Sequence, residues 1–207
     1  MPDPPASRTL IVESARRLVE ADGVEALSMR KVAAEVGLAP TAIYWHVGSR
    51  DDLLHAVLDE MVADLPPIRA EGADARERIA SVVRAARDEF LDGMCTLQLA
   101  NEVGRGNELS FRAQVALAQE LTAAGIDGDD AAPMLRSLLF LVGGFVVIEQ
   151  QYRERDPAEF ATGDLWAAME ATGIAPTLAA AMAEPTDTDA LFAYTLDRLL
   201  DSILGQA

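Results

Sequence analysis

Polar and aromatic side chains crowd a short stretch near the N-terminus of this 207-residue chain. Thr41, Tyr44, Trp45 and His46 fall within about two helical turns that contain few apolar residues. A helix built only for packing would carry a broader apolar face. Hydroxyl, imidazole and indole groups can instead hydrogen-bond to phosphates and base edges. The chemistry that this stretch favours is recognition of a nucleic acid.

The elements around this stretch have the spacing of a helix-turn-helix. Apolar periodicity predicts a helix over about 10–22 and two short helices over 29–36 and 41–47. Gly23 ends the first of these helices, and Ser28 is a suitable N-cap for the second. Two short helices after a supporting helix match the motif whose last helix enters the major groove. An ordinary helical corner is the alternative interpretation.

The rest of the chain also predicts helices, so the expected fold class is all-α. Ser49 and Asp52 resemble a capping pair for a fourth helix, which the prolines at 66 and 67 end. Asp74 and Glu77 resemble another such pair. Further helices are expected at about 74–91, 95–104, 107–124, 130–153 and 188–204. The middle of 130–153 is apolar on every side, which predicts a helix buried all round.

Composition narrows the class of protein. Half of the residues are hydrophobic but only 5% are aromatic, which favours helices over strands. Cys95 is the single cysteine, so an internal disulfide and a cysteine zinc site are excluded. The polar, proline-rich start lacks the apolar core of a signal peptide. The apolar run 138–148 is shorter than the roughly 20 residues of a membrane span. A cytoplasmic protein without a membrane partner is expected.

The net charge of −17 argues at first against nucleic-acid binding, because phosphate contacts need cations. The acidity is unevenly distributed, however. Residues 1–54 carry six basic and eight acidic side chains, whereas the remaining chain carries eleven basic and 26 acidic ones. The acidic part is expected to face away from nucleic acid and to favour solubility.

Residues typical of enzymes are scarce. Lys31 is the only lysine, so no Gly-Lys-Ser/Thr phosphate loop exists, and no Gly-x-Ser-x-Gly motif occurs. His46 and His55, the two histidines, both lie in the first quarter of the chain. Adjacent carboxylates such as Asp51 and Asp52 stand at expected helix starts, where capping is the simpler role. We therefore expect neither an enzyme nor a cofactor; a helical protein-interaction scaffold without DNA binding remains the alternative.

Three stretches carry a resemblance to a known family. They are 27–38 (Leu-Ser-Met-Arg-Lys-Val-Ala-Ala-Glu-Val-Gly-Leu), 42–47 (Ala-Ile-Tyr-Trp-His-Val) and 50–54 (Arg-Asp-Asp-Leu-Leu). Together they resemble the DNA-binding domain of TetR-family regulators without a gap, and the Tyr-Trp-His-Val string is closer to the tetracycline repressor branch. Residues 144–151 and 196–203 resemble the regulatory domain of that branch.

The resemblance implies a set of DNA-contacting residues. Arg30 would reach a base edge, and the start of the third helix would meet bases or a thymine methyl group. The aromatic residues and His46 would contact phosphates and neighbouring bases, and Arg50 a phosphate. The full expected set is Ser28, Met29, Arg30, Pro40, Thr41, Ala42, Tyr44, Trp45, His46 and Arg50. Ala39 and Gly48 depart from the family pattern, which predicts a weak cap and one phosphate contact fewer.

The same resemblance implies the division of labour along the chain. We expect a helix-turn-helix domain at 7–48, a connector helix at 49–66 and a ligand-binding and dimerisation domain at 67–207. The apolar helices near 130–153 and 190–204 would pair across a twofold axis in a homodimer, and Gly143 and Gly144 would allow close approach. Satisfaction of these apolar faces inside one subunit is the alternative. The expected partners are double-stranded operator DNA, a second copy of the chain and a small-molecule effector of unknown identity.

The effector site is only weakly indicated. Candidate pocket residues are Met94, Phe111, Met134, Phe140, Glu149, Trp166 and Met169, although for each of them a place in the plain core is the stronger alternative. The resemblance to the tetracycline repressor branch would imply a magnesium chelate as ligand, held partly through histidine of the regulatory domain. This chain has no histidine after His55 and no recognisable carboxylate array, so no metal site is expected. We expect a largely apolar, metal-independent effector bound between the connector helix and the middle helices.

Overall fold

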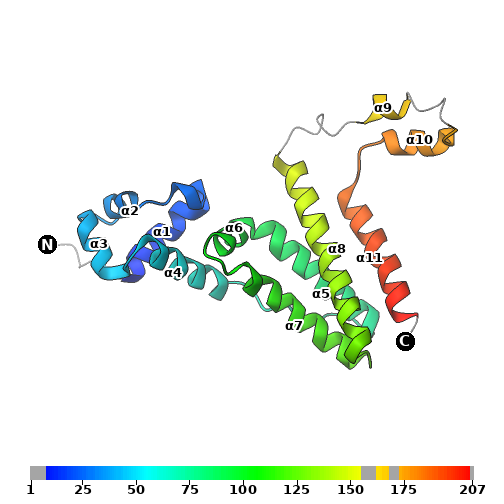
Figure 1. Cartoon of the computed structure of the whole chain (residues 1–207), viewed down its shortest axis with the longest axis horizontal. Coiled ribbons are helices and arrows are strands. Elements are labelled where there is room, and N and C mark those ends of the chain that lie inside the picture. The colour runs from blue at the N-terminus through cyan, green and yellow to red at the C-terminus, as the bar shows by residue number, and fades with distance from the viewer. Residues whose placement is uncertain (1–7, 155–161, 168–172, 206–207) are drawn as a thin grey trace. The chain divides into compact units, whose positions relative to one another are not determined.

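The computed structural model describes residues 8–154, 162–167 and 173–205 (Figure 1). Every element in these ranges is helical, which confirms the all-α prediction. The elements are α1 (Arg8–Asp22), the 3-10 turn η1 (Val24–Ala26), α2 (Met29–Glu35), α3 (Pro40–Val47), α4 (Arg50–Ala63), α5 (Ala75–Asp92), α6 (Met94–Glu102), α7 (Gly106–Ala123), α8 (Gly128–Glu154), α9 (Gly163–Ala167), α10 (Pro176–Ala183) and α11 (Thr188–Leu204).

Capping side chains explain where several helices begin. The Ser28 hydroxyl accepts a hydrogen bond from the Lys31 backbone NH, at 3.3 Å. At the start of α4 the capping box is complete: Ser49 Oγ accepts from the Asp52 NH at 3.1 Å, and Asp52 Oδ2 accepts from the Ser49 NH at 2.8 Å. Both contacts match the prediction.

The expected capping box at the start of α5 is only half present. Asp74 Oδ1 accepts from the Glu77 NH at 2.8 Å, as predicted. The Glu77 carboxylate does not return to Asp74 but accepts from the Ala73 NH at 2.7 Å. Glu77 therefore bonds to the residue before Asp74 and does not complete the box.

The chain divides into two compact units, and the division does not follow the expected functional boundaries. The first unit comprises residues up to Arg69 together with Asp92–Val115, and the second comprises Ala70–Leu91 and the chain from Ala116 onward. In the first unit, α6 packs against η1 and α4. Fully buried side chains of this core include Ile11, Ile43, Leu53, Leu54 and Leu99. Helices α1 to α4 therefore form one compact unit with α6 and the first half of α7.

In the second unit, α11 lies along α8 (Figure 1). Phe192, Leu196, Leu200 and Ile203 repeat at helical spacing on α11 and are buried. The Phe192 ring meets the Phe145 ring of α8 edge-on, with centroids 5.1 Å apart. Part of the apolar face at 188–204 is therefore buried within the same chain, as the alternative interpretation stated.

The expectation that α8 is buried all round is wrong for the single chain. Leu138, Val142 and Val146 are buried, but Phe140 is 80% exposed and Val147 60% exposed. The reason is that no element of the described part of the chain covers this second face. By length and composition alone α8 is long and apolar enough to cross a membrane. Core helices of soluble proteins meet the same two criteria.

The two helices α9 and α10 were not predicted. They pack against each other, and α10 begins at Pro176, the first-turn position where proline is tolerated. Their sequences carry no clear apolar periodicity: α9 has only five residues, and α10 is rich in alanine.

Candidate DNA-binding interface

The local sequence of α2 and α3 builds a tight corner. Gly37 adopts a φ of 70°, a left-handed conformation that favours glycine, and the following Leu38 NH donates to the Ala33 carbonyl at 2.9 Å. On the inner side, Ile43 and Val47 lie one helical turn apart on α3 and are buried. This pair anchors α3, so that its opposite face is presented to solvent.

The outward face of α3 carries the polar and aromatic side chains that the sequence singled out. Thr41 and His46 are exposed, Tyr44 is 53% exposed and Trp45 is 91% exposed. An indole left almost wholly in water contributes nothing to the core of this unit, and large exposed aromatic groups are typical of binding surfaces. The structure thus brings these four predicted residues together on one accessible helix face.

Residues of α2 add two exposed cations to the corner. Arg30 and Lys31 are exposed on α2. Pro40 is exposed at the start of α3, and Ala42 is half-buried. The N-cap position of α3 is Ala39, which makes no side-chain capping bond, as expected.

Met29 and Ser28 are placed differently from the expected DNA-contacting set. The Met29 side chain is 6% exposed and lies in the core with Val32 and Ala33, so it does not belong to the accessible face. Its position immediately after the N-cap puts it on the inner side of α2. The Ser28 hydroxyl is used as the N-cap of the same helix.

Arg50 is already engaged inside the first unit. Its Nε donates to the Leu27 carbonyl and its Nη2 to the Val24 carbonyl, each at 3.2 Å. Its Nη1 lies 4.0 Å from Glu102 of α6. A phosphate contact of Arg50 stays a prediction, and the structure adds a role in tying the start of α4 to η1.

Sequence reasoning missed the polar contacts that position α2. Ser14 on α1 is completely buried, and its hydroxyl donates to Glu35 at the end of α2, at 2.6 Å. A serine within an apolar helical pattern gives no sign of such a partner 21 residues away. The contact fixes α2 on the supporting helix, and thereby the corner that presents α3.

The expected effector residues are not gathered around one described cavity. Met94 and Phe111 belong to the first unit, where Phe111 is 62% exposed. Met134, Phe140, Glu149 and Trp166 belong to the second unit, and Met169 lies outside the described residues.

Glu149 has a structural partner. Its buried carboxylate accepts hydrogen bonds from Arg87 of α5, with Nη2 to Oε2 at 2.8 Å. Arg87 also bonds to Asp189 of α11, and its guanidinium lies 4.7 Å from the Phe192 ring centroid. Burial lowers the pKa of Arg87, but the bonds to Glu149 and Asp189 outweigh this effect and raise it. Glu149 therefore joins α8 to α5 through a paired charge.

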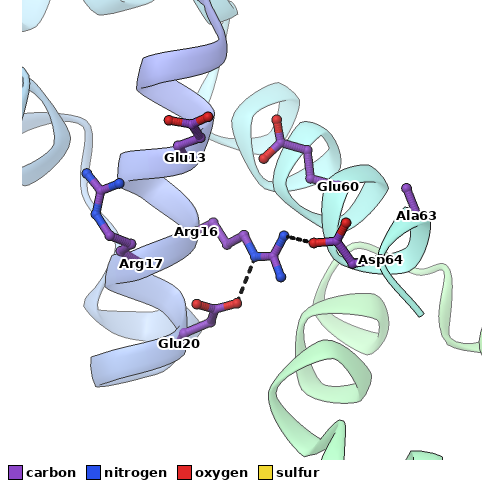
Figure 2. A pocket seen from close by; sticks show the side chains of 7 residues that line it. All are labelled: Glu13, Arg16, Arg17, Glu20, Glu60, Ala63 and Asp64. Atoms are coloured by element: carbon purple, nitrogen blue, oxygen red, sulfur yellow. Dashed lines mark hydrogen bonds and ion pairs between the residues drawn. The ribbon is translucent and has the colours of Figure 1, made fainter. Parts of the chain in front are cut away.

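A cavity of about 410 Å³ lies in the first unit, beside α1 and α4 (Figure 2). Its lining is strongly polar: Glu13, Arg16, Arg17, Glu20, Glu60, Ala63 and Asp64. None of the expected effector residues lines it.

Within the described ranges, no group of three or more His, Cys, Asp or Glu side chains is arranged to hold a metal ion.

Comparison with known proteins agrees with this architecture. Residues 11–57 match the model of the bacterial regulatory proteins of the tetR family, a span that contains the corner and most of α4. A transcriptional regulator of Saccharopolyspora erythraea is 29% identical over 148 residues, covering 72% of this chain and 63% of that protein. The chain spans about three-fifths of the length of such relatives.

A second relative extends the likeness along the whole chain. The class A tetracycline repressor protein from transposon 1721 of Escherichia coli is 26% identical over 200 residues, covering 93% of this chain and 88% of that protein. The fold matches the TetR-family protein ActR of Streptomyces coelicolor, solved in complex with (S)-DNPA, with a TM-score of 0.64. That alignment is 22% identical and covers 99% of this chain and 100% of the other. Residues 11–57 thus match the tetR family of bacterial regulatory proteins, and along most of its length the chain is similar to a tetracycline repressor protein.

Proposed function

We propose that this protein is a cytoplasmic transcription regulator that binds operator DNA as a homodimer and is released by a small-molecule effector. The observation that carries the proposal is the accessible face of α3, where Thr41, Tyr44, Trp45 and His46 project from a helix anchored by two buried residues. Hydroxyl, imidazole and indole donors on a helix of this size suit contacts with phosphates and base edges in a major groove. No catalytic role is assigned to any residue.

The proposal includes a dimer formed through α8 and α11. Phe140, Val147 and Ile148 leave an apolar face of α8 open to solvent, and Leu191 and Tyr194 do so on α11. A Cβ added at Gly143 or Gly144 would meet no atom within 4 Å, so these glycines leave room for a second helix. Two such helix pairs across a twofold axis would form a four-helix bundle.

The effector is proposed to be largely apolar and independent of metal. The ActR structure supports the idea that a protein of this fold can hold a small molecule. The metal-independent part rests on a sequence difference: the resemblance would imply a histidine among the residues that hold a magnesium chelate, and this chain has none after His55. Differential affinity of the effector for one dimer conformation would then shift the separation of the two α3 helices.

A gel shift with DNA fragments from the neighbouring genomic region tests DNA binding. We expect specific retardation by the wild type and an affinity loss of about fivefold or more for Trp45→Ala, because a base or phosphate contact is worth about 1–3 kcal/mol. Leu178→Ala, which truncates another exposed side chain on α10, should bind as the wild type does. Absence of retardation even at low salt would favour the protein-interaction scaffold instead.

Screening apolar compounds for release of the retarded complex, with and without EDTA, tests the effector class. Release that is unchanged by EDTA supports the proposal. Release only by tetracycline-like chelators with magnesium present would contradict it.

A further inference from the structure

Three arginines surround the C-terminal half of α4. Arg16 comes from α1, Arg105 from the turn between α6 and α7, and Arg112 from α7, and all three lie in the first unit. We call them the arginine collar. Arg16 binds Asp64, the C-cap residue of α4. Arg105 Nη1 binds Asp59 at 2.7 Å. Arg112 Nη2 donates to the carbonyls of Leu65 and Pro66, at 3.4 and 2.5 Å.

Each of the first two arginines is also fixed on its own segment. Arg16 Nε binds Glu20, one turn further along α1, at 2.7 Å, and Figure 2 shows the side chain reaching from α1 to both carboxylates. Arg105 Nη2 binds Glu108 in the first turn of α7 at 2.7 Å. A carboxylate on the same segment thus helps to orient each guanidinium toward its partner on α4. The hydrogen bond to Glu20, the larger effect, and the one to Asp64 raise the pKa of Arg16. In the same way, the hydrogen bond to Glu108, again the larger effect, and the one to Asp59 raise the pKa of Arg105.

The collar arginines contact α4 on more than one side. Asp59 and Asp64 are five residues apart, which places them roughly 140° apart around a helix with 3.6 residues per turn. The Arg112 contacts lie just beyond the end of α4, where free carbonyls and the helix dipole favour a cation. Movement of the helix end toward either side would break at least one of these contacts.

The position of the collar matters because α4 is the covalent connection between the DNA-binding helices and the rest of the chain. Exposed ion pairs contribute little to overall stability, so stability alone is a weak reason for three such contacts at one helix end. Their geometry suits a different role, which is to fix the direction in which α4 leaves the α1–α3 corner.

We propose that the arginine collar positions α4 and thereby sets the half-site spacing that the dimer accepts on DNA. This inference rests on the proposed function. The collar arginines are positioning residues and need not touch DNA. If α4 is held rigidly, the separation of the two α3 helices is narrowly defined. Loss of Asp59 and Asp64, the carboxylates of α4 that the collar binds, would let α4 change direction. The dimer would then tolerate operators whose half-sites are moved by one base pair, or about 3.4 Å along the DNA axis.

The test compares binding to a series of operators in which the half-site separation is changed by plus or minus one base pair. The collar variant is Asp59→Asn with Asp64→Asn. The matched control is Glu13→Gln with Glu60→Gln, which also removes two carboxylate charges, from α1 and α4 beside Asp64, but breaks no ion pair of the described residues. Asp59→Glu with Asp64→Glu keeps both carboxylates. Thermal unfolding of each variant verifies that it is folded.

We expect the wild type, the control and the glutamate variant to discriminate against shifted spacing by about tenfold or more, and the collar variant by about threefold or less. If the double variant does not fold, Asp59→Asn alone should show an intermediate profile. A uniform affinity loss at all spacings, an unchanged profile, or equal flattening in the control would each overturn the inference. Failure of the wild type to bind any operator would instead contradict the proposed function.

Discussion

At the scale of single residues, the cations of the first unit divide into exposed and structural ones. Arg30 projects from α2 into solvent. Arg50 is held by two carbonyls of the η1 region and lies near Glu102. A hydrogen bond from a charged group to a partly buried carbonyl typically contributes more to folding than a neutral one. Substitutions of the two arginines should therefore have different consequences.

We expect Arg30→Ala to reduce affinity for the cognate operator by about 1–3 kcal/mol and to relax sequence specificity, without lowering the melting temperature. Arg50→Ala should lower the melting temperature and also weaken binding to all sequences alike. Thermal unfolding and binding to cognate and scrambled DNA distinguish these patterns. Unchanged DNA affinity for Arg30→Ala would exclude Arg30 from the interface.

Individual residues were predictable only where a regular pattern fixes their side. Ile43 and Val47 follow helical spacing, and the structure buries both. Met29 shows the limit: the family resemblance placed it among the DNA-contacting residues, but its side chain is buried with Val32 and Ala33. The carbonyl partners of Arg50 lie 23 and 26 residues away, and no local pattern encodes such contacts.

At the scale of elements, helix ends were well predicted because their signals are local. The Ser49–Asp52 box uses residues three apart, and the structure contains both of its bonds. The partners of α8, by contrast, depend on the tertiary arrangement. Its sequence fixes how apolar each face is, but nothing local tells whether a face is covered by the same chain.

The capping box of α4 predicts a pH dependence of stability. The side-chain and backbone hydrogen bonds from Ser49 lower the pKa of Asp52 below its ordinary value. A lowered carboxyl pKa means that the stabilisation is present above the unfolded-state pKa and is lost as pH falls through the folded one. The melting-temperature difference between wild type and Asp52→Asn should therefore be full at pH 7 and shrink below about pH 4.

Asp51→Asn is the control for this measurement. It removes a neighbouring first-turn carboxylate that takes no part in the box, so its effect at pH 7 should be smaller. A difference for Asp52→Asn that does not decrease in acid would contradict the role of the charged carboxylate.

At the scale of the whole molecule, the charge distribution opposes association of two copies, whereas the exposed apolar face of α8 favours it. Most of the net charge of −17 lies beyond residue 54, where repulsion between two copies would oppose association. The exposed face of α8 at Phe140, Val147 and Ile148 is almost free of charge. Association through this face would bury apolar area and keep the acidic surfaces in solvent.

Val147→Asp should therefore convert the protein to a monomer at micromolar concentration, with dimer affinity reduced by at least about tenfold, because it places an unpaired charge in an apolar interface. Val115→Asp on α7 is the matched control: the same change at an exposed valine, 40% accessible against 60%, should leave the dimer intact. Sedimentation velocity measures both. Since one monomer contacts a single half-site, Val147→Asp should also lose operator affinity. Its melting temperature should equal that of the wild type when both are measured at concentrations where the wild type is monomeric. A Val147→Asp protein that remains dimeric would show that the second copy binds elsewhere.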